Sequence, residues 1–413
     1  MAGKASTDHA ALFPLERAAS AITSARRAVL ADRYAVDSFV VEWRELTELE
    51  PIVNEWRELA ARALEPNVFY EPAFALAGVP VFGRGAGAML VWSGTTPRKL
   101  LGFFPARIEP RRYGVKLPVL VGWTHPYAPL GTPLVEREAA EPVITAWLAH
   151  LAGDPALPGL VLLPFVPEDG PFAAALGAIL RRAQMPSADF NRHRRAQLAP
   201  HGDRSLYVER ALGPRKHKEL RRIGRRLADL GAVLFAAATE PAAVAVAIED
   251  FFVLEAGGWK GKAGTAAAHH DGIRSFIKTA MSALAAAGQA SIDRILVDGR
   301  AIAATITLRS AEAAWFWKIA YDESFARYSP GVLLTVAVTE QLIDDATIAR
   351  TDSCATANHP MINHIWRERL ALGDRFVAVR PRALFARGRR LETIRRAVIA
   401  AATSAKHAVT RFR

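Results

Sequence analysis

The segment Trp315–Leu334 decides the fold and reads Trp-Phe-Trp-Lys-Ile-Ala-Tyr-Asp-Glu-Ser-Phe-Ala-Arg-Tyr-Ser-Pro-Gly-Val-Leu-Leu. Its spacing predicts a strand, then a polar loop, then a helix that starts at Ser329-Pro330-Gly331. The free N–H groups and the dipole of a helix start form an anion site, and glycine lets a phosphate approach the backbone. Arg327 would add a charge-assisted hydrogen bond. The alternative is an ordinary helix start, with Ser329 as N-cap and Pro330 at N1.

The strand itself contains a lysine, Lys318, next to Trp317. Strict alternation places Trp315, Trp317 and Ile319 on one face, and Phe316, Lys318 and Ala320 on the other. A lysine in a central strand is costly unless it faces water or a ligand. We therefore expect Lys318 to line a cleft and to stabilise charge on an acyl group. An edge strand with a snorkelling lysine is the alternative.

Working outward, both halves of the chain show the same order of helix, antiparallel strands, Pro/Gly loop, helix and strand. Asp298-Gly299 is a strong hairpin signal within the second half. The pattern predicts an α/β protein of the α+β type with two tandem domains, each a mixed, mostly antiparallel sheet flanked by helices. The expected parts are a flexible segment 1–35, domains 36–200 and 201–381, and a basic tail helix 382–413 outside the core.

Two further stretches gather polar groups. Gly257–Thr265 is glycine-rich but fails the P-loop pattern, and it is expected to be a mobile loop that presents Trp259 as a flat surface and Lys260 as a phosphate or carboxylate contact. A predicted strand ends near Asp352, where ligands collect in α/β sheets. Asp352 and His359 are candidates for proton transfer, although His359 could instead cap the next helix.

Composition excludes several classes of protein. A single cysteine, Cys354, leaves no disulfide framework and no multi-cysteine metal site. No run of 18 apolar residues and no apolar signal core are present, so we expect a cytoplasmic protein. The net charge of +12 is uneven, because 192–226 and 380–413 each carry +9 and the rest of the chain carries −6. The basic helix expected at 214–230 could bind phosphates or tRNA, and the tail could contact the inner membrane face weakly.

These motifs together resemble the GNAT acyltransferase superfamily, in particular its acetyltransferase-like branch linked to bacterial polysaccharide or cellulose biosynthesis, which is related to Fem-type aminoacyltransferases. The stretches that carry the resemblance are Lys218–Leu227, Gly258–Gly261, Asp298–Ala303, Tyr321–Gly331 and Asp352. The pyrophosphate loop typical of GNAT enzymes is only approximated by Arg327 to Gly331.

The resemblance implies acetyl transfer from acetyl-CoA, a co-substrate, to an amine or hydroxyl of a saccharide or cell-envelope precursor, without a metal. The expected catalytic residues are Lys318, Asp352 and His359. The expected acetyl-CoA contacts are Arg327, Tyr328, Ser329, Gly331 and Val332, and the expected substrate contacts are Trp259, Lys260 and Tyr321. Two alternatives stay open: a Fem-like aminoacyltransferase that uses aminoacyl-tRNA, and a non-catalytic GNAT-fold partner of a polysaccharide synthesis machinery.

Overall fold

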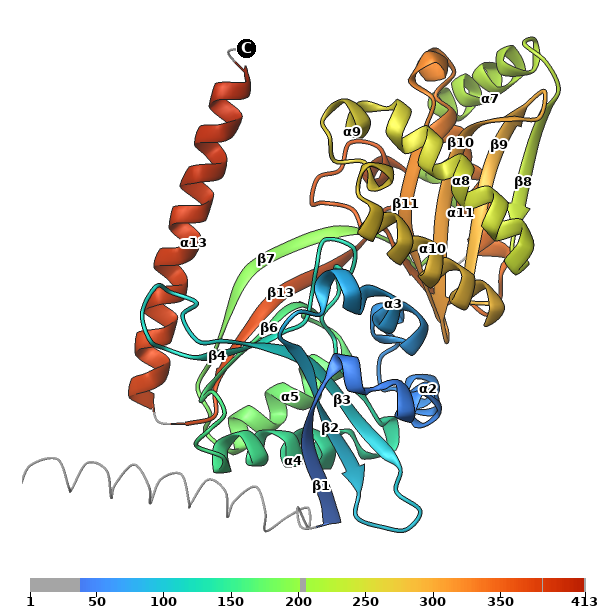
Figure 1. Cartoon of the computed structure of the whole chain (residues 1–413). Coiled ribbons are helices and arrows are strands. Elements are labelled where there is room, and N and C mark those ends of the chain that lie inside the picture. The colour runs from blue at the N-terminus through green and yellow to red at the C-terminus, as the bar shows by residue number, and fades with distance from the viewer. Residues whose placement is uncertain (1–37, 201–205, 381, 412–413) are drawn as a thin grey trace, which may run out of the picture.

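The computed structural model describes residues 38–200, 206–380 and 382–411, so the predicted segment 1–35 lies outside the described residues. A 13-stranded sheet runs through the molecule (Figure 1). Its order from edge to edge is β1 (Phe39–Glu45), β2 (Ala86–Ser93), β3 (Leu100–Glu109), β4 (Val119–Gly122), β6 (Leu160–Pro167), β13 (Glu368–Ala378), β7 (Ser187–Leu198), β12 (Arg350–Asp352), β11 (Ala313–Tyr321), β10 (Arg300–Ser310), β9 (Ala290–Val297) and β8 (Val233–Ala238). The short β5 (Leu134–Val135) pairs with β3.

The same arrangement appears when the sheet is followed inward from either edge. Strands β1 to β4 on one side and β8 to β11 on the other are antiparallel neighbours. Each set is followed by one parallel neighbour, β6 beside β4 and β12 beside β11. The predicted fold class is confirmed: two similar halves share a mixed, mostly antiparallel sheet flanked by helices.

Two long strands join the halves at the middle of the sheet. Strand β13, near the end of the chain, lies antiparallel between β6 and β7, and β7 reaches β12 through Gln197 and Leu198. From the sequence alone we expect a short strand at 376–379 and none at 187–198, because both stretches are rich in charged residues and lack a clear alternation. A strand from the second half thus completes the sheet of the first.

Helices cover the faces of the sheet (Figure 1). They are α2 (Val53–Arg62), α3 (Pro72–Phe82), α4 (Ala140–Gly153), α5 (Pro171–Arg182), α6 (Tyr207–Leu212), α7 (Pro214–Ala228), α8 (Pro241–Gly257), α9 (Trp259–Lys262), α10 (Asp271–Ala286), α11 (Pro330–Asp344), α12 (Ile362–Ile365) and α13 (Arg382–Arg411). The expectation of a loop throughout Gly257–Thr265 is wrong, since α9 occupies its centre. Gly261 permits this turn, because a Cβ there would lie 1.7 Å from the carbonyl oxygen of Ala256.

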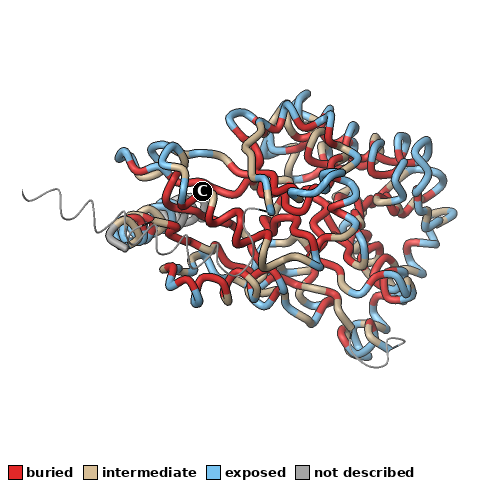
Figure 2. Tube along the Cα trace, turned by 90° about the horizontal axis from the view of Figure 1, so that it is seen from below, coloured by how far each residue is buried: buried red, intermediate tan, exposed pale blue. Residues whose placement is uncertain are grey.

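One aromatic core crosses the junction between the halves. Helix α10 buries Phe276, Ala280 and Leu284 along one face, which matches a helical period. Phe276 lies edge-on to Phe74 of α3, with 5.3 Å between ring centroids. Buried residues follow the sheet continuously through both halves (Figure 2). Folding one half alone would therefore expose large aromatic surface.

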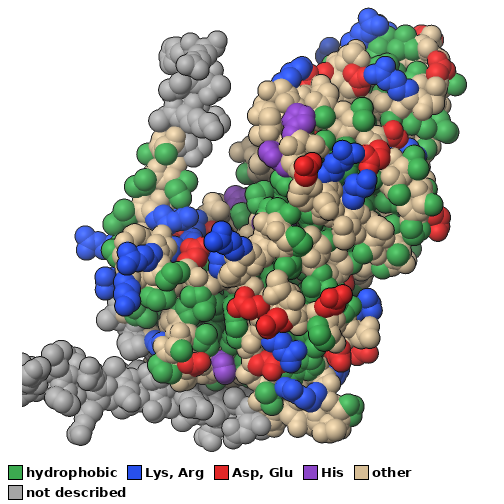
Figure 3. All heavy atoms as spheres, viewed as in Figure 1, with side chains coloured by type: hydrophobic (Ala, Val, Ile, Leu, Met, Phe, Trp, Pro, Cys, Tyr) green, Lys and Arg blue, Asp and Glu red, His purple; other side chains and the backbone are tan. Residues whose placement is uncertain are grey.

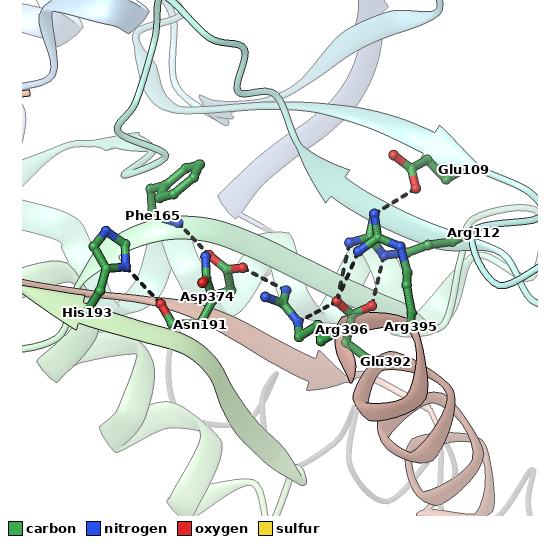
Figure 4. A network of polar contacts seen from close by, with 9 residues as sticks. All are labelled: Glu109, Arg112, Phe165, Asn191, His193, Asp374, Glu392, Arg395 and Arg396. Carbon is green, nitrogen blue, oxygen red and sulfur yellow. Dashed lines mark hydrogen bonds and ion pairs between the residues drawn. The ribbon is translucent and has the colours of Figure 1, made fainter. Parts of the chain in front are cut away.

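The basic tail helix is anchored to the core, so the prediction that it lies outside the core is wrong. The carboxylate of Glu392 is fully buried, and it binds the guanidinium groups of Arg112 at 3.0 Å and Arg396 at 2.7 Å (Figure 4). Arg396 also pairs with Asp374 of β13 at 2.7 Å. Lys and Arg side chains gather around the lower part of α13 (Figure 3). Among the described helices, none combines the length and the apolar content that a membrane crossing needs.

Candidate active site

An open cleft lies where two parallel strands separate. Strands β11 and β12 pair only from Ala313 to Trp315, opposite Arg350 to Asp352. Strand β11 then continues to Tyr321, whereas the chain leaves the sheet after Asp352. The gap between 316–319 and 353–355 forms one side of a cavity of about 650 Å³. The start of α11, residues 359–362 and the loop at 126–129 of the first half complete its walls.

A β-bulge in β11 determines which side chains face this cleft. The register against β10 shifts at Ile306, so that Ile306 pairs with Lys318 and Thr307 pairs with Phe316. Trp317 is the extra residue, and the strict alternation predicted from the sequence breaks there. Trp317 and Lys318 both reach Tyr127, while Ile319 packs with the core on the opposite face of the sheet. The expected pairing of Trp317 with Ile319 on one face is therefore wrong, and the bulge is the reason.

Lys318 is a half-buried cation in an aromatic setting. Its Nζ lies 4.1 Å from the ring centroid of Tyr127 and 5.3 Å from that of Trp317. Burial, together with the nearby Lys260, lowers the pKa of Lys318 to about 8. The aromatic faces stabilise the ammonium form, which still predominates at neutral pH. The geometry suits a positive charge that meets an anionic atom of a bound molecule.

A buried glutamate, which the sequence reasoning missed, supports the lysines. Glu255 accepts a hydrogen bond from Lys260 Nζ at 2.8 Å and another from the backbone N–H of Ala267 at 2.8 Å. Burial opposes its ionisation, yet Lys260 and these hydrogen bonds keep the pKa of Glu255 below its ordinary value. The available signal was a glutamate four positions after Phe251 on the apolar face of α8.

Helix α9 brings Trp259 to the mouth of the cleft. The side chain of Trp259 is exposed, and its backbone N–H donates to Glu323 at 2.7 Å. Lys262 pairs with the second carboxylate oxygen of Glu323 at 2.5 Å. This small helix is therefore tied to the segment Glu323–Tyr328 that precedes α11. The expected substrate contacts Trp259, Lys260 and Tyr321 all line the same cleft.

The start of α11 forms a further wall. Ser329 adopts left-handed backbone angles (φ 47°, ψ 48°) and makes no side-chain cap, so it does not act as the conventional N-cap. Ser329, Gly331 and Val332 line the cleft. Arg327 and Tyr328 do not: the Arg327 guanidinium is exposed and lies 4.8 Å from the ring centroid of Tyr328, whose side chain is buried in the core.

His359 lines the cleft and also starts the next helical turn. Its Nδ1 accepts the backbone N–H groups of Met361 at 3.3 Å and Ile362 at 3.5 Å. Burial lowers the pKa of His359, which favours the neutral ring. With Nδ1 acting as an acceptor, the proton resides on Nε2. In this arrangement His359 is a hydrogen-bond donor and is poorly placed to act as a base.

Asp352 lies apart from these residues. It is buried, forms an ion pair with Arg195 of β7 and accepts the backbone N–H of Cys354 at 3.0 Å. It lines a different cavity. Cys354 does line the cleft, and burial raises the pKa of its thiol well above the ordinary value, which disfavours the nucleophilic thiolate.

The equivalent gap in the first half is bridged. There the chain leaves β4 and returns through a loop whose Gly131 donates its N–H to the carbonyl of Phe165, at 3.2 Å. A Cβ on Gly131 would lie 2.0 Å from the carbonyl oxygen of Pro164, so only glycine fits this close approach. The same loop presents Pro126, Tyr127 and Pro129 to the cleft of the second half. The two similar halves thus differ at this position: the gap is bridged in the first half and open as a cleft in the second.

Residues 214–359 match the family model described as an acetyltransferase (GNAT) domain. This GNAT segment runs from the start of α7 to His359 and contains every site residue that the sequence predicted. No curated protein matches the chain.

Two solved structures share the fold over most of their length. One is the C-terminal domain (DUF2156) of a protein from Agrobacterium fabrum named as a lysylphosphatidylglycerol synthetase; it is 13% identical with a TM-score of 0.50, over 83% of this chain and 95% of that one. The other is FemX, 9% identical with a TM-score of 0.52, over 81% and 96% of the two chains. At these identities the likeness shows the fold alone.

Proposed function

We propose that this protein is an acyltransferase that moves an acetyl group from acetyl-CoA to an amine or hydroxyl of a saccharide or cell-envelope precursor. The observation that carries the proposal is the cleft between the diverging strands β11 and β12. A helix start and a lysine line it from two sides. The match of residues 214–359 to a GNAT acetyltransferase domain supports the same conclusion.

The cleft supplies the groups that direct acyl transfer requires. At the start of α11, Pro330 has no N–H, and Val332 and Leu333 donate theirs to the carbonyl of Ser329 at 3.0 and 3.1 Å. The N–H of Gly331 and the helix dipole would therefore hold phosphate, and the missing side chain of Gly331 keeps that approach open. Beyond Trp315, no strand of the described residues pairs with β11 on its β12 side, so its peptide groups are available to an extended ligand. The ammonium of Lys318 and the Nε2–H of His359 would stabilise the oxyanion that forms when the acceptor attacks the thioester carbonyl. The carbon–sulfur bond then breaks, and the proton that the acceptor releases ends on the departing thiolate, which leaves as the free thiol of coenzyme A.

The charges of the cleft indicate the class of acceptor. Lys260 and Lys318 line the cleft, and no aspartate or glutamate does so among the described residues. A polycationic acceptor would find no carboxylate there and would be repelled by Lys318. We therefore infer an acceptor that is neutral or anionic, such as a hydroxyl or an uncharged amine of an acidic or phosphorylated saccharide. This remains compatible with the polysaccharide branch that the motifs resemble.

Calorimetric titration with acetyl-CoA tests the donor. We expect saturable binding that is lost in Gly331→Val, because a Cβ at this position already lies 3.2 Å from the ring of Tyr321 and a larger group would enter the cleft. Gly177→Ala is the matched control, since its Cβ would meet only the flexible end of Arg181 in α5. Absence of acetyl-CoA binding at about millimolar concentration would rule out this donor.

A second candidate is aminoacyl transfer from tRNA, and α7 is the observation that favours it. Arg221, Arg222 and Arg225 are exposed on this helix, near further basic side chains at 215–218. Binding of tRNA would then weaken steeply with salt, and replacing these three arginines by alanine would reduce the salt dependence. Salt-independent or undetectable tRNA binding would exclude this candidate.

A further inference from the structure

A second cavity, separate from the cleft, lies between the two halves. It has a volume of about 230 Å³ and is bounded by the segments 65–66, 130–132 and 167–171 of the first half. The paired parts of β11 and β12 and the start of β13 close it from the second half. At roughly 30 Å³ for each water-sized group, it has room for about seven or eight non-hydrogen atoms. A ligand here would thus be much smaller than an acyl-CoA.

Two buried polar side chains in this cavity each have one oxygen atom without a partner among the described residues. Glu65 is 5% exposed and Thr132 is 1% exposed. Among the residues that the structure describes, neither Glu65 Oε2 nor Thr132 Oγ1 has a hydrogen-bond partner. The backbone N–H of Phe172, in the first turn of α5, donates a hydrogen bond to Glu65. Burial nonetheless raises the pKa of this carboxyl to about 7. Leaving buried polar atoms unpaired is costly, and such atoms in a cavity are typical of a site for a ligand.

A basic group faces the same space. Arg350, at the start of β12, lines the cavity and is close enough to lower the pKa of Glu65. Yet no ion pair between the two side chains is found within the described parts of the chain. Two aspartates also line the cavity: Asp352 is occupied by Arg195, and Asp169 is exposed to solvent. Glu65 and Arg350 therefore face one cavity without forming an ion pair with each other.

We propose that this cavity binds a small free α-amino acid. Its ammonium group would lie between the carboxylate of Glu65 and the hydroxyl of Thr132, and its carboxylate would meet the guanidinium of Arg350. The available volume limits the ligand to the size of glycine, alanine or serine. Among the described residues, no group of three metal-ligating side chains occurs, so the same donors do not form a metal site.

Calorimetry on the full chain tests this site with glycine, L-alanine and L-serine as probes. We expect saturable binding of at least one probe, weakened ten-fold or more in Glu65→Gln and in Arg350→Met. The matched control, Glu48→Gln, removes an exposed carboxylate and should bind as the wild type does. Unaltered binding in Glu65→Gln, or no saturation by any probe at about 10 mM, would overturn the proposal.

Two further probes keep the test decisive if a variant fails to fold. Ethanolamine lacks the carboxylate, and L-lactate lacks the ammonium group while keeping the size of L-alanine, so neither should bind the wild-type protein. Binding of either as tightly as L-serine would refute recognition of both charged ends. Acetyl-CoA binding should be unchanged in Glu65→Gln, because Glu65 does not line the cleft. The two proposals can therefore fail independently.

Discussion

Acidification should weaken the junction between the two halves through a single buried histidine. The ring of His125 stacks on Phe82, with 4.0 Å between centroids, and Trp123 and Phe276 surround it at 5.2 and 6.0 Å. Its Nδ1 accepts the backbone N–H of Tyr127 at 3.3 Å, and its Nε2 has no partner among the described residues. Burial, reinforced by Arg107, lowers the pKa of His125 to about 3.

The sign and size of the effect follow from proton linkage. Between about pH 6.5 and pH 3, the unfolded chain binds a proton at His125 and the folded chain does not, so stability falls as the pH falls. At pH 5 this one group should lower the free energy of unfolding by about 2 kcal/mol relative to pH 8. The figure depends little on the folded pKa, because pH 5 lies well above it.

Urea unfolding of the wild type and of His125→Asn at several pH values measures this effect. Asparagine can still accept the Tyr127 N–H, and its smaller volume should lower stability equally at all pH values. The difference between the two proteins should therefore shrink by about 2 kcal/mol from pH 8 to pH 5. His364→Asn, which removes an exposed imidazole, is the control. A difference between wild type and His125→Asn that does not vary with pH would refute the reasoning.

Three other predictions follow from buried charges. If the ammonium of Lys318 stabilises the oxyanion, kcat/KM for acetyl transfer should fall as the pH rises through about 8. Lys318→Arg should remove that fall, and Lys318→Met should lower kcat by about 10²-fold. A rise of kcat/KM through the same pH range would instead indicate that Lys318 acts as a base. Glu392→Gln should cost about 3 kcal/mol in chemical unfolding and expose α13 to proteolysis, because Arg112 and Arg396 lose a buried partner; unchanged proteolysis would contradict the anchoring role. The pKa of Glu65 is raised, so its contribution to the free energy of unfolding is present below pH 4.5 and is lost as the pH rises through about 7. The free energy of unfolding of Glu65→Gln should therefore rise by about 3 kcal/mol relative to that of the wild type between pH 4.5 and pH 8. Identical pH profiles of the two proteins would disprove the burial of that carboxyl.

The local pattern of the sequence was sufficient for much of the fold. The strand, loop and helix order of Trp315–Leu334 carries its own signals, as does the Asp298-Gly299 hairpin, and both occur as predicted. Pairing over long distances carries no such local signal. Strands β7 and β13 are about 170 residues apart in the chain and become neighbours only in the complete sheet.

The residues of the candidate site divide in the same way, into those with a local signal in the sequence and those whose position depends on distant partners. Lys318, Ser329 and Trp259 could be found because each is unusual in its local context: a charge in a strand, a helix start, and an aromatic in a glycine-rich stretch. Asp352 looked equally suitable, but its partner Arg195 is 157 residues away, and only the fold brings them together. The face of Ile319 relative to Trp317 was predicted wrongly for a different reason, since one bulge residue breaks an alternation that is otherwise regular.

The cleft depends on the first half although every predicted site residue lies in the second. The ring that holds the ammonium of Lys318 belongs to Tyr127, and the carbonyl of Tyr127 also accepts the indole N–H of Trp317 at 2.9 Å. The loop that carries Tyr127 is fixed in turn by Gly131, which bridges the gap beside β6. Closure of the gap in one half thus builds a wall of the open cleft in the other. The site therefore needs both halves, and the shared strands β7 and β13 keep the two in register.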